Sequence, residues 1–264
     1  MICELKDVSR AEWLFSGIED SIVRSCLAGM MGGKIYVTDA EKPKSAAAFL
    51  ACFVFYVGEP SRELVMAKPR GLVCMVPQNA EWEKLITECH PCAGRDTRYA
   101  IRKDTRFQRD RLRAIAASLP EGYEFRRIDA ELYDACLGAE LFTDCVCHFS
   151  SVEEYLSLGR GYAVIKEGRI VSAASSYTVF PGGIEVEIDT VPEERRKGLA
   201  SAVGAKLILS CLDDGLYPSW DAANMDSVRL AQRLGYELDR EYTCWWLDGS
   251  SDQPIKDPDR PILP

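Results

Sequence analysis

The fold of this chain is decided at residues 188–200, which read IDTVPEERRKGLA. A strand pattern ends here, and a helix begins whose first turns carry mostly small residues. The N-terminus of a helix offers unpaired N–H groups and a partial positive charge, which together attract phosphate. Gly198 and Ala200 let a ligand approach the backbone closely, and the basic residues beside them would add charged hydrogen bonds. A charged loop entering a surface helix has the same pattern, so the turn alone leaves both interpretations open.

The elements expected around this turn follow a regular order. Ser151 with Glu154 three positions later predicts a capped helix N-terminus, and Glu167-Gly168 predicts a two-residue hairpin turn. The pattern predicts a strand, two helices, three antiparallel strands, a helix, a strand, a helix and a last strand. Their expected ranges are 123–128, 130–137, 151–159, 161–166, 170–179, 184–191, 196–213, 218–222, 226–234 and 242–247.

The first third of the chain has a mixed α/β pattern. Apolar residues at helical spacing predict a helix over 11–30. Further expected elements are strands at 34–38, 46–57, 71–76 and 99–102 and helices at 80–89 and 106–119. The turn signal at residues 120–122 (PEG) marks a domain boundary. We therefore predict an N-terminal α/β domain (1–121), a second domain (122–248) and a Pro-rich extended tail (249–264).

The central turn resembles the acetyl-CoA motif of the GNAT superfamily of N-acetyltransferases, Arg/Gln-x-x-Gly-x-Gly/Ala, through Arg195, Gly198 and Ala200. Residues 188–192 resemble the family's hydrophobic-x-Val-x-Pro pattern, and residues 224–236 (NMDSVRLAQRLGY) resemble its Asn-x-x-Ala/Ser-x-x-Leu-x-x-x-x-Gly-Phe segment. The resemblance covers about residues 123–247. More narrowly, EVEIDT, RKGLA and WDAAN, which begin at residues 185, 196 and 220, resemble the subfamily that includes the zwittermicin A resistance acetyltransferase.

The resemblance implies the GNAT fold, an α/β (α+β) architecture in which helices flank a mixed, mostly antiparallel sheet. It also implies acetyl-CoA as co-substrate, with its pantetheine arm between two strands that splay apart and its pyrophosphate on the amides of residues 196–201. The residues expected to bind it are Ile188, Thr190, Arg195, Arg196, Lys197, Gly198, Leu199, Ala200, Ser201, Asn224 and Ser227. Asn224 would equally serve as a helix cap. The N-terminal domain is expected to be a diverged copy of the fold without a second CoA site.

Two acids on the strand before the turn are candidates for the general base. Glu185 and Glu187 are two residues apart, so they share one face of the strand with Asp189. A carboxylate in a partly desolvated cleft can take a proton from an ammonium group, and Glu185 is the preferred candidate. Solvent-facing acids of an amphipathic strand are the alternative. Many family members carry a tyrosine that protonates the CoA thiolate, and Ala231 stands at that position here.

The resemblance implies an acceptor pocket beside the first two helices and the last strands of the domain. His148, Phe149 and Tyr155 fall there and are our candidates for substrate binding. A histidine beside aromatic residues is more often structural, so His148 is either a substrate-contacting residue or a structural one.

Composition and charge restrict the class of protein. The net charge of −9 opposes a nucleic-acid partner, which normally requires a basic face. The absence of a long apolar run predicts no membrane span, and a charged N-terminus without an apolar stretch favours the cytoplasm. The 11 cysteines are odd in number and fit reduced thiols. We expect no metal site, because the cysteines and the two histidines lack two well-spaced ligand pairs.

The resemblance implies an acetyl-CoA-dependent N-acetyltransferase, which we expect to act on a primary amine of a small molecule by direct transfer in a ternary complex. A CoA-binding regulatory or degenerate module without turnover is the alternative, which the loss of the tyrosine favours. An aminoacyl-tRNA-dependent transferase is a third reading, which the acidity of the chain opposes. The oligomeric state stays open, with a homodimer as one option.

Overall fold

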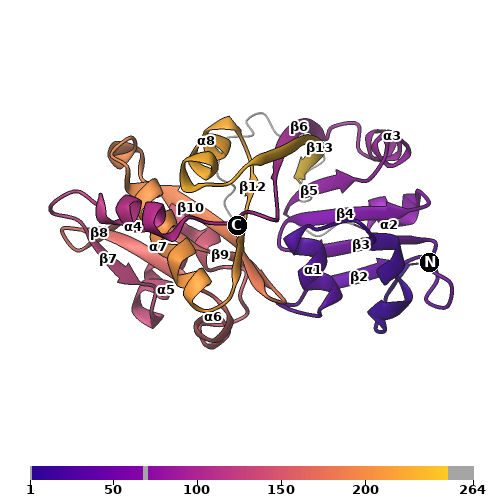
Figure 1. Cartoon of the computed structure of the whole chain (residues 1–264). Coiled ribbons are helices and arrows are strands. Elements are labelled where there is room, and N and C mark those ends of the chain that lie inside the picture. Colours follow the sequence, from indigo (N-terminus) through magenta and orange to yellow (C-terminus); the bar gives the residue numbers. More distant parts are fainter. Residues whose placement is uncertain (1, 68–70, 249–264) are drawn as a thin grey trace. The chain divides into compact units, whose positions relative to one another are not determined.

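The computed structural model describes residues 2–67 and 71–248 (Figure 1). The Pro-rich tail predicted at 249–264 lies outside the described residues. The chain divides into two compact units, one of residues 1–98 and 241–264 and the other of residues 99–240. Two strands, β6 (Gly94–Ile101) and β13 (Leu238–Asp248), have residues in both units.

This division differs from the boundary predicted after residue 121. Residues 99–121 belong to the second unit, where α4 (Arg109–Ala117) packs against α7 (Leu199–Asp213). The Arg109 guanidinium donates a hydrogen bond to the Leu212 carbonyl at 2.9 Å. The turn signal at residues 120–122 therefore marks a loop within one unit, because a turn motif reports local backbone geometry and carries no information about helix packing.

The first unit contains an open sheet with the strand order β1-β2-β3-β4-β5-β13. Its elements are β1 (Cys3–Glu4), β2 (Lys34–Val37), β3 (Ser45–Leu50), β4 (Phe53–Gly58), β5 (Leu72–Pro77), α1 (Ser21–Leu27), α2 (Arg62–Met66), α3 (Ala80–Cys89) and two 3₁₀ turns, η1 (Val8–Arg10) and η2 (Glu12–Phe15). Its core packs Tyr56 against Trp82 with ring centroids 5.1 Å apart.

Two predictions in this unit were wrong. The continuous helix expected over 11–30 is broken, because Gly17 has a φ of +84° and the side chain of Asp20 caps a new helix at the Ile22 amide. The strand expected over 46–57 is a hairpin of β3 and β4, with Ala51 at a φ of +53° in the turn. Apolar periodicity alone cannot locate such breaks, since the apolar pattern continues through them.

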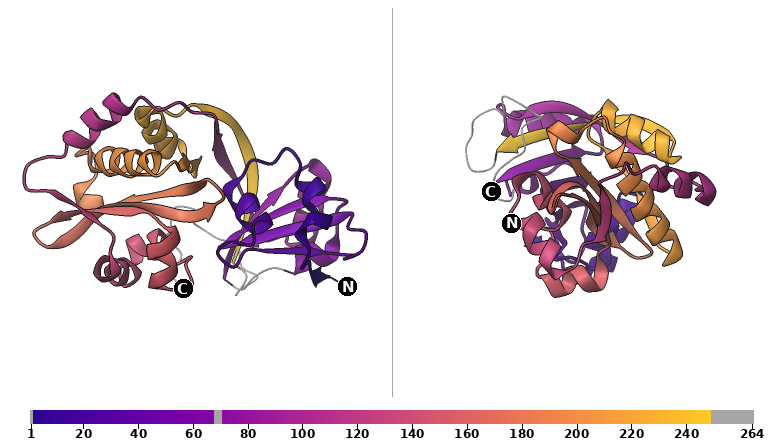
Figure 2. Two further views of the ribbon diagram at one scale, coloured as in Figure 1. Left: turned by 60° about the horizontal axis from the view of Figure 1, so that its bottom comes forward. Right: turned by 90° about the vertical axis from the view of Figure 1, so that its left-hand side faces the viewer.

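The second unit is a curled mixed sheet with helices on both faces, which confirms the predicted fold class (Figure 2). Its strand order is β11-β10-β9-β8-β7, antiparallel except for the parallel pair β10–β11. The strands are β7 (Glu124–Arg127), β8 (Gly161–Lys166), β9 (Arg169–Phe180), β10 (Gly183–Thr190) and β11 (Tyr217–Ser219). The other elements are α5 (Ala130–Leu137), η3 (Glu140–Cys145), α6 (Val152–Leu158), η4 (Pro192–Glu194), β12 (Asp221–Ala222) and α8 (Met225–Leu234).

Local sequence signals account for several boundaries in this unit. The β8–β9 turn is formed by Glu167 and Gly168 with φ values of +50° and +76°, as a two-residue hairpin requires. The Ser151 hydroxyl accepts the Glu154 amide at 3.2 Å, which caps α6 as predicted. The helix expected from residue 196 begins at Leu199, because Gly198 adopts a left-handed conformation.

β10 and the edge strand β11 separate along their length. β10 pairs with β11 only from Gly183 to Glu185, the last pair being Glu185 with Ser219. The chain then leaves β11, and β12 pairs with the end of β6 instead. Beyond Glu185, no strand among the described residues pairs with β10 on this side. The gap leaves β10 without a strand partner on this side over residues 186–190, where the Ile188 amide and the Thr190 carbonyl bond to the side chains of Glu187 and Arg195. Over the same described ranges, no helix is long and apolar enough to cross a membrane.

Candidate functional site

The turn that opens α7 has the geometry of an anion cradle. Gly198 has a φ of +84° and stands at the N-cap of α7, and Arg196 has a φ of +62°. A Cβ atom built on Gly198 would meet no atom within 4 Å, so this stretch of backbone faces open space. The first amides of the 15-residue helix α7 therefore begin beside a region that a ligand can enter.

A pocket of about 250 Å³ lies at this helix N-terminus. Seven of the predicted cofactor-binding residues line it: Thr190, Arg195, Arg196, Gly198, Leu199, Ala200 and Ser201. The sequence analysis missed its other wall, which α8 supplies through Asp226, Arg229, Leu230 and Arg233. The Arg233 guanidinium donates to the Ser201 hydroxyl at 3.3 Å, which joins the two walls. The spacing of these α8 residues, three and four apart, is the helical signal that could have identified this wall.

Two basic residues of the motif hold the turn itself. The Arg195 Nε donates to the Thr190 carbonyl at 3.1 Å, which ties the turn back to the end of β10. Lys197 does not line the pocket and bonds instead to Glu194 at 2.7 Å. Hydrogen bonds from Lys166, Lys197 and Tyr123 lower the pKa of Glu194 to about 2, so this nearly buried carboxylate stays charged.

Asn224 and Ser227 have structural partners, and neither lines the pocket. The Asn224 side chain caps α8 by accepting the Ser227 amide at 2.9 Å, and the Ser227 hydroxyl accepts the Trp220 indole N–H at 3.1 Å. These contacts match the capping alternative for Asn224. Ile188 lies on β10 in the gap, and its amide donates to the Glu187 carboxylate at 3.2 Å.

The three acids of β10 differ in their surroundings. Glu185 is buried, and neither of its carboxylate oxygens has a hydrogen-bond partner among the described residues. Glu187 is partly exposed and bonds to the Ile188 amide. Burial and the nearby Asp144 raise the pKa of Asp189 to about 7, against an opposing effect of Arg195. Glu185 is therefore the acid whose polar atoms are least satisfied by the protein.

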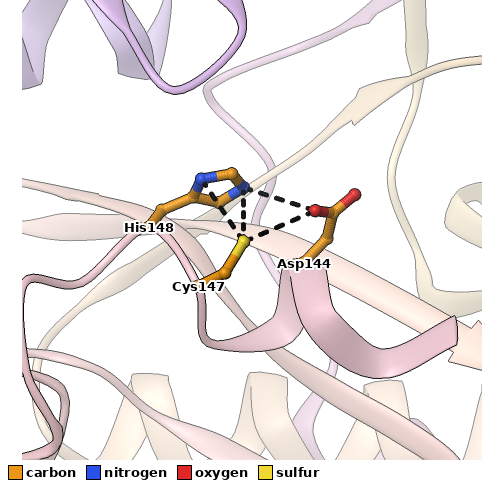
Figure 3. A group of neighbouring side chains, drawn as sticks. All are labelled: Asp144, Cys147 and His148. Atoms are coloured by element: carbon orange, nitrogen blue, oxygen red, sulfur yellow. Dashed lines mark hydrogen bonds and ion pairs between the residues drawn. The ribbon is translucent and has the colours of Figure 1, made fainter. Parts of the chain in front are cut away.

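His148 lies in a small cluster of titratable groups at the end of η3. Figure 3 shows Asp144, Cys147 and His148 close together; the thiol sulfur lies 3.6 Å from the Asp144 Oδ1 and 3.7 Å from the His148 Nδ1. The His148 ring also packs on Tyr177 with centroids 4.2 Å apart. Burial lowers the pKa of His148, which Asp144 opposes, so a neutral imidazole is favoured. All three side chains are of types that bind metal ions. A metal-binding measurement on this cluster therefore tests the prediction that the chain has no metal site.

Phe149 and Tyr155 lie in the core beneath the sheet. Their rings pack edge to face at 5.0 Å, and the Tyr155 hydroxyl bonds to the Ser175 hydroxyl at 2.9 Å. Tyr155 is 1% exposed and Phe149 is 5% exposed. Their contacts therefore give direct substrate binding no support. His148 lies 3.8 Å from Asp144, whose charge also contributes to the raised pKa of Asp189 on β10.

A comparison with protein-family models matches residues 12–245 to the family described as GNAT acetyltransferase. Among curated proteins, the chain is 31% identical over 132 residues to an uncharacterized N-acetyltransferase, YdfB of Bacillus subtilis (strain 168). That match covers 48% of this chain and 49% of the relative, so the chain spans about half the length of the curated protein that it matches.

Two solved structures extend the comparison. A GCN5-related N-acetyltransferase-like protein from Streptococcus suis 89/1591 is 41% identical, with a TM-score of 0.87 over 92% of this chain and 99% of that one. A tandem GNAT protein from the clavulanic acid biosynthesis pathway is 13% identical, with a TM-score of 0.54 over 94% of this chain and 98% of that one. The second likeness concerns the fold alone.

Proposed function

From the premise that the chain belongs to the GNAT acetyltransferase family, we propose that it transfers the acetyl group of acetyl-CoA to a primary amine of a small molecule. Transfer is direct, within a ternary complex. The observation that carries the proposal is the pocket at the N-terminus of α7, which arginines from the turn and from α8 line together.

The residues of this pocket fit the pyrophosphate of a CoA thioester. The amides of residues 198–201 supply unpaired N–H groups, and Arg196, Arg229 and Arg233 supply positive charge around the pocket. Acetyl-CoA, when bound, supplies an activated thioester that an amine nitrogen can attack. The separation of β10 from β11 leaves room for an extended arm along Ile188 and Thr190, so the predicted backbone contacts remain part of this proposal.

Glu185 is the proposed general base, with Glu187 as the second candidate. A buried carboxylate without a partner in the described protein is suited to accept a proton from a substrate ammonium. Glu187 already accepts a hydrogen bond from the Ile188 amide, one of the backbone groups proposed to contact the pantetheine arm of the cofactor. We therefore expect Glu185 to act on the amine and Glu187 to affect cofactor binding more than proton transfer.

The alternative function, CoA binding without turnover, has one observation in its favour. Ala231, at the position of the family's usual tyrosine, is a fully buried residue of α8. It has no group to donate a proton to a thiolate. The proposal therefore relies on the acidity of the CoA thiol itself or on a bound water for that proton.

A thiol-release assay with acetyl-CoA and a panel of amines separates the two functions. The panel contains amino sugars, polyamines, amino acids, aminoglycosides and zwittermicin A, the last because of the narrower resemblance. Acetyl-CoA binding without thiol release across the panel would support the non-catalytic module. Glu185→Gln and Glu187→Gln test the base, and full activity in both variants would refute both assignments.

A cytoplasmic location and a homodimer complete the proposal. The sequence feature that supports the location is the cysteine content, which fits reduced thiols. Cell fractionation tests the location, and sedimentation of the purified full chain tests the homodimer.

A further inference from the structure

A row of polar side chains crosses the centre of the second unit's sheet. Glu185 of β10 is the register partner of Thr178 on β9 and of Ser219 on β11. Directly opposed residues project from the same face of a sheet, with Cβ atoms about 5 Å apart. The exposed fractions are 0% for Thr178, 7% for Glu185 and 2% for Ser219, so the whole row is buried.

Only one end of this row is satisfied by the protein. The Ser219 hydroxyl accepts a hydrogen bond from the Lys103 ammonium group at 2.8 Å. The Thr178 hydroxyl and both oxygens of Glu185 have no hydrogen-bond partner anywhere in residues 2–67 and 71–248. Buried polar groups in folded proteins almost always have a partner, which is another protein group or an ordered water. Two such orphans as direct cross-strand neighbours therefore point to one shared ligand.

The row lies where the sheet changes its geometry. The β9–β10 register shifts between Glu185 and Val186, which leaves Tyr177 as an extra residue on β9. The β10–β11 pairing ends at the Glu185–Ser219 pair. Bulges of this kind occur often beside active sites, because they redirect a side chain and end the pairing. Glu185 thus stands where the gap between β10 and β11 begins, with Thr178 beside it on β9.

We infer that Thr178 and Glu185 together bind one water molecule, and that Thr178 is a positioning residue that holds this water against the carboxylate. The ligand is water because the two side chains are cross-strand neighbours, yet neither forms a hydrogen bond with the other. A water bridges such a pair with two hydrogen bonds and can use the remaining lone pair of Ser219 for a third.

This water has a function only if the proposed acetyl transfer is correct. An N–H bond of the substrate ammonium breaks as the water oxygen takes its proton. One O–H bond of the water breaks as a proton passes to the Glu185 carboxylate. The products are a neutral amine, a protonated Glu185 and a regenerated water. No further reactant is needed for this step.

Three variants test the site. Thr178→Val keeps the shape of the side chain and removes the hydroxyl, and Thr178→Ser keeps the hydroxyl. Ser176→Ala is the matched control, because this buried hydroxyl of β9 lies outside the row and has its own partners at the Arg160 amide (2.9 Å) and carbonyl (3.1 Å). Thermal unfolding of each variant first shows that it is folded.

The kinetic readout is the split between kcat and KM. We expect Thr178→Val to lower kcat by about 10- to 100-fold, with little change in the KM of the amine, since a positioned proton acceptor is worth about 10²- to 10⁴-fold. Thr178→Ser should restore kcat to within about 3-fold of the wild type. The solvent deuterium isotope effect on kcat should change in Thr178→Val and stay unchanged in Ser176→Ala. Wild-type kcat in Thr178→Val would overturn the positioning role.

A crystal structure of the wild-type chain tests the water itself, independently of turnover. We expect a water within about 3.2 Å of both the Thr178 hydroxyl and a Glu185 oxygen. A direct hydrogen bond between these two side chains, with no water, would overturn the inference. If the chain shows no acetyl transfer but the water is present, the binding site stands and the proposed function fails. If Thr178→Val does not fold, the inference is tested by the water in the wild-type crystal structure and by the kcat of Thr178→Ser.

Discussion

Replacement of Arg233 by alanine gives a direct test of the α8 wall of the pocket. The guanidinium lines the pocket beside the α7 N-terminus and is held there by the Ser201 hydroxyl. A hydrogen bond to a charged group contributes about 1.5 to 3 kcal/mol, and solvent exposure of Arg233 reduces this to about 1 to 1.5 kcal/mol. We therefore expect the Kd for CoA to rise about 5- to 12-fold in Arg233→Ala.

Neighbouring charges make the prediction sharper. Arg229 forms an ion pair with Asp226, so part of its charge is already neutralised, and Arg229→Ala should weaken binding less than Arg233→Ala. Asp226→Asn removes a negative charge from the pocket wall and should tighten binding. The matched control is Arg240→Ala, since Arg240 is also exposed but does not line the pocket.

Isothermal titration calorimetry with CoA measures these affinities. The effect of Arg233→Ala should shrink between about 0.1 M and about 0.5 M salt, because salt screens exposed charges. Binding by Arg233→Ala within twofold of that of Arg240→Ala at low salt would refute the role of α8 as a phosphate-binding wall. Near-UV circular dichroism checks that the variants keep their packing.

Three further predictions concern packing, pH and metal. Gly204→Val should destabilise the chain by about 1 to 3 kcal/mol in urea unfolding, because even a Cβ there lies 2.8 Å from the Ile188 Cδ1; unchanged stability would contradict the packing of α7 on β10. The pKa of Asp189 is about 7 in the folded chain and about 4 in the unfolded chain, so the folded state binds this proton more tightly. The free energy of unfolding of the wild type should therefore fall relative to that of Asp189→Asn as the pH rises from about 4 to 7. A difference in unfolding free energy that stays constant between pH 5 and pH 8 would contradict this. Thiol release should survive EDTA, and a stoichiometric zinc that is lost in Cys147→Ser would contradict the predicted absence of a metal site.

The sequence was most informative where local chemistry decides local structure. The Ser151 cap and the Glu167-Gly168 turn were predictable because each depends on a few adjacent residues. The left-handed Gly198 was not predicted, since the expected helix ran through it from residue 196. The strand expected at 242–247 was assigned to the second domain, but this part of β13 belongs to the first unit, where it pairs with β5.

Contacts between distant segments were less predictable. Arg233 is 32 residues from Ser201, and only the packing of α8 beside α7 brings them together. Phe149 and Tyr155 are aromatic residues of the kind that often line binding sites, but their rings pack on each other in the core. An aromatic residue does not reveal from sequence whether its ring faces a ligand or the core.

The two units share an arrangement that bears on the predicted diverged copy. In the second unit, the β9–β10 hairpin is followed by α7 and by β11, which pairs in parallel with β10. In the first unit, the β3–β4 hairpin is followed by α2 and by β5, which pairs in parallel with β4. This correspondence favours a diverged copy, which stays a prediction.

The same correspondence explains why only one unit is expected to bind CoA. The helix at the equivalent place, α2, has five residues, against 15 in α7, and Ser61 caps it by accepting the Leu64 amide with its own side chain. A short helix has a weak dipole, and in α2 one of the free N-terminal amides, that of Leu64, is already bonded. In α7 the N-cap is Gly198, which has no side chain to occupy those amides, and Arg195 and Lys197 are bound to Thr190 and Glu194. Two of the motif's basic residues, Arg195 and Lys197, thus hold the shape of the turn, while Arg196 and the arginines of α8 supply positive charge along the pocket.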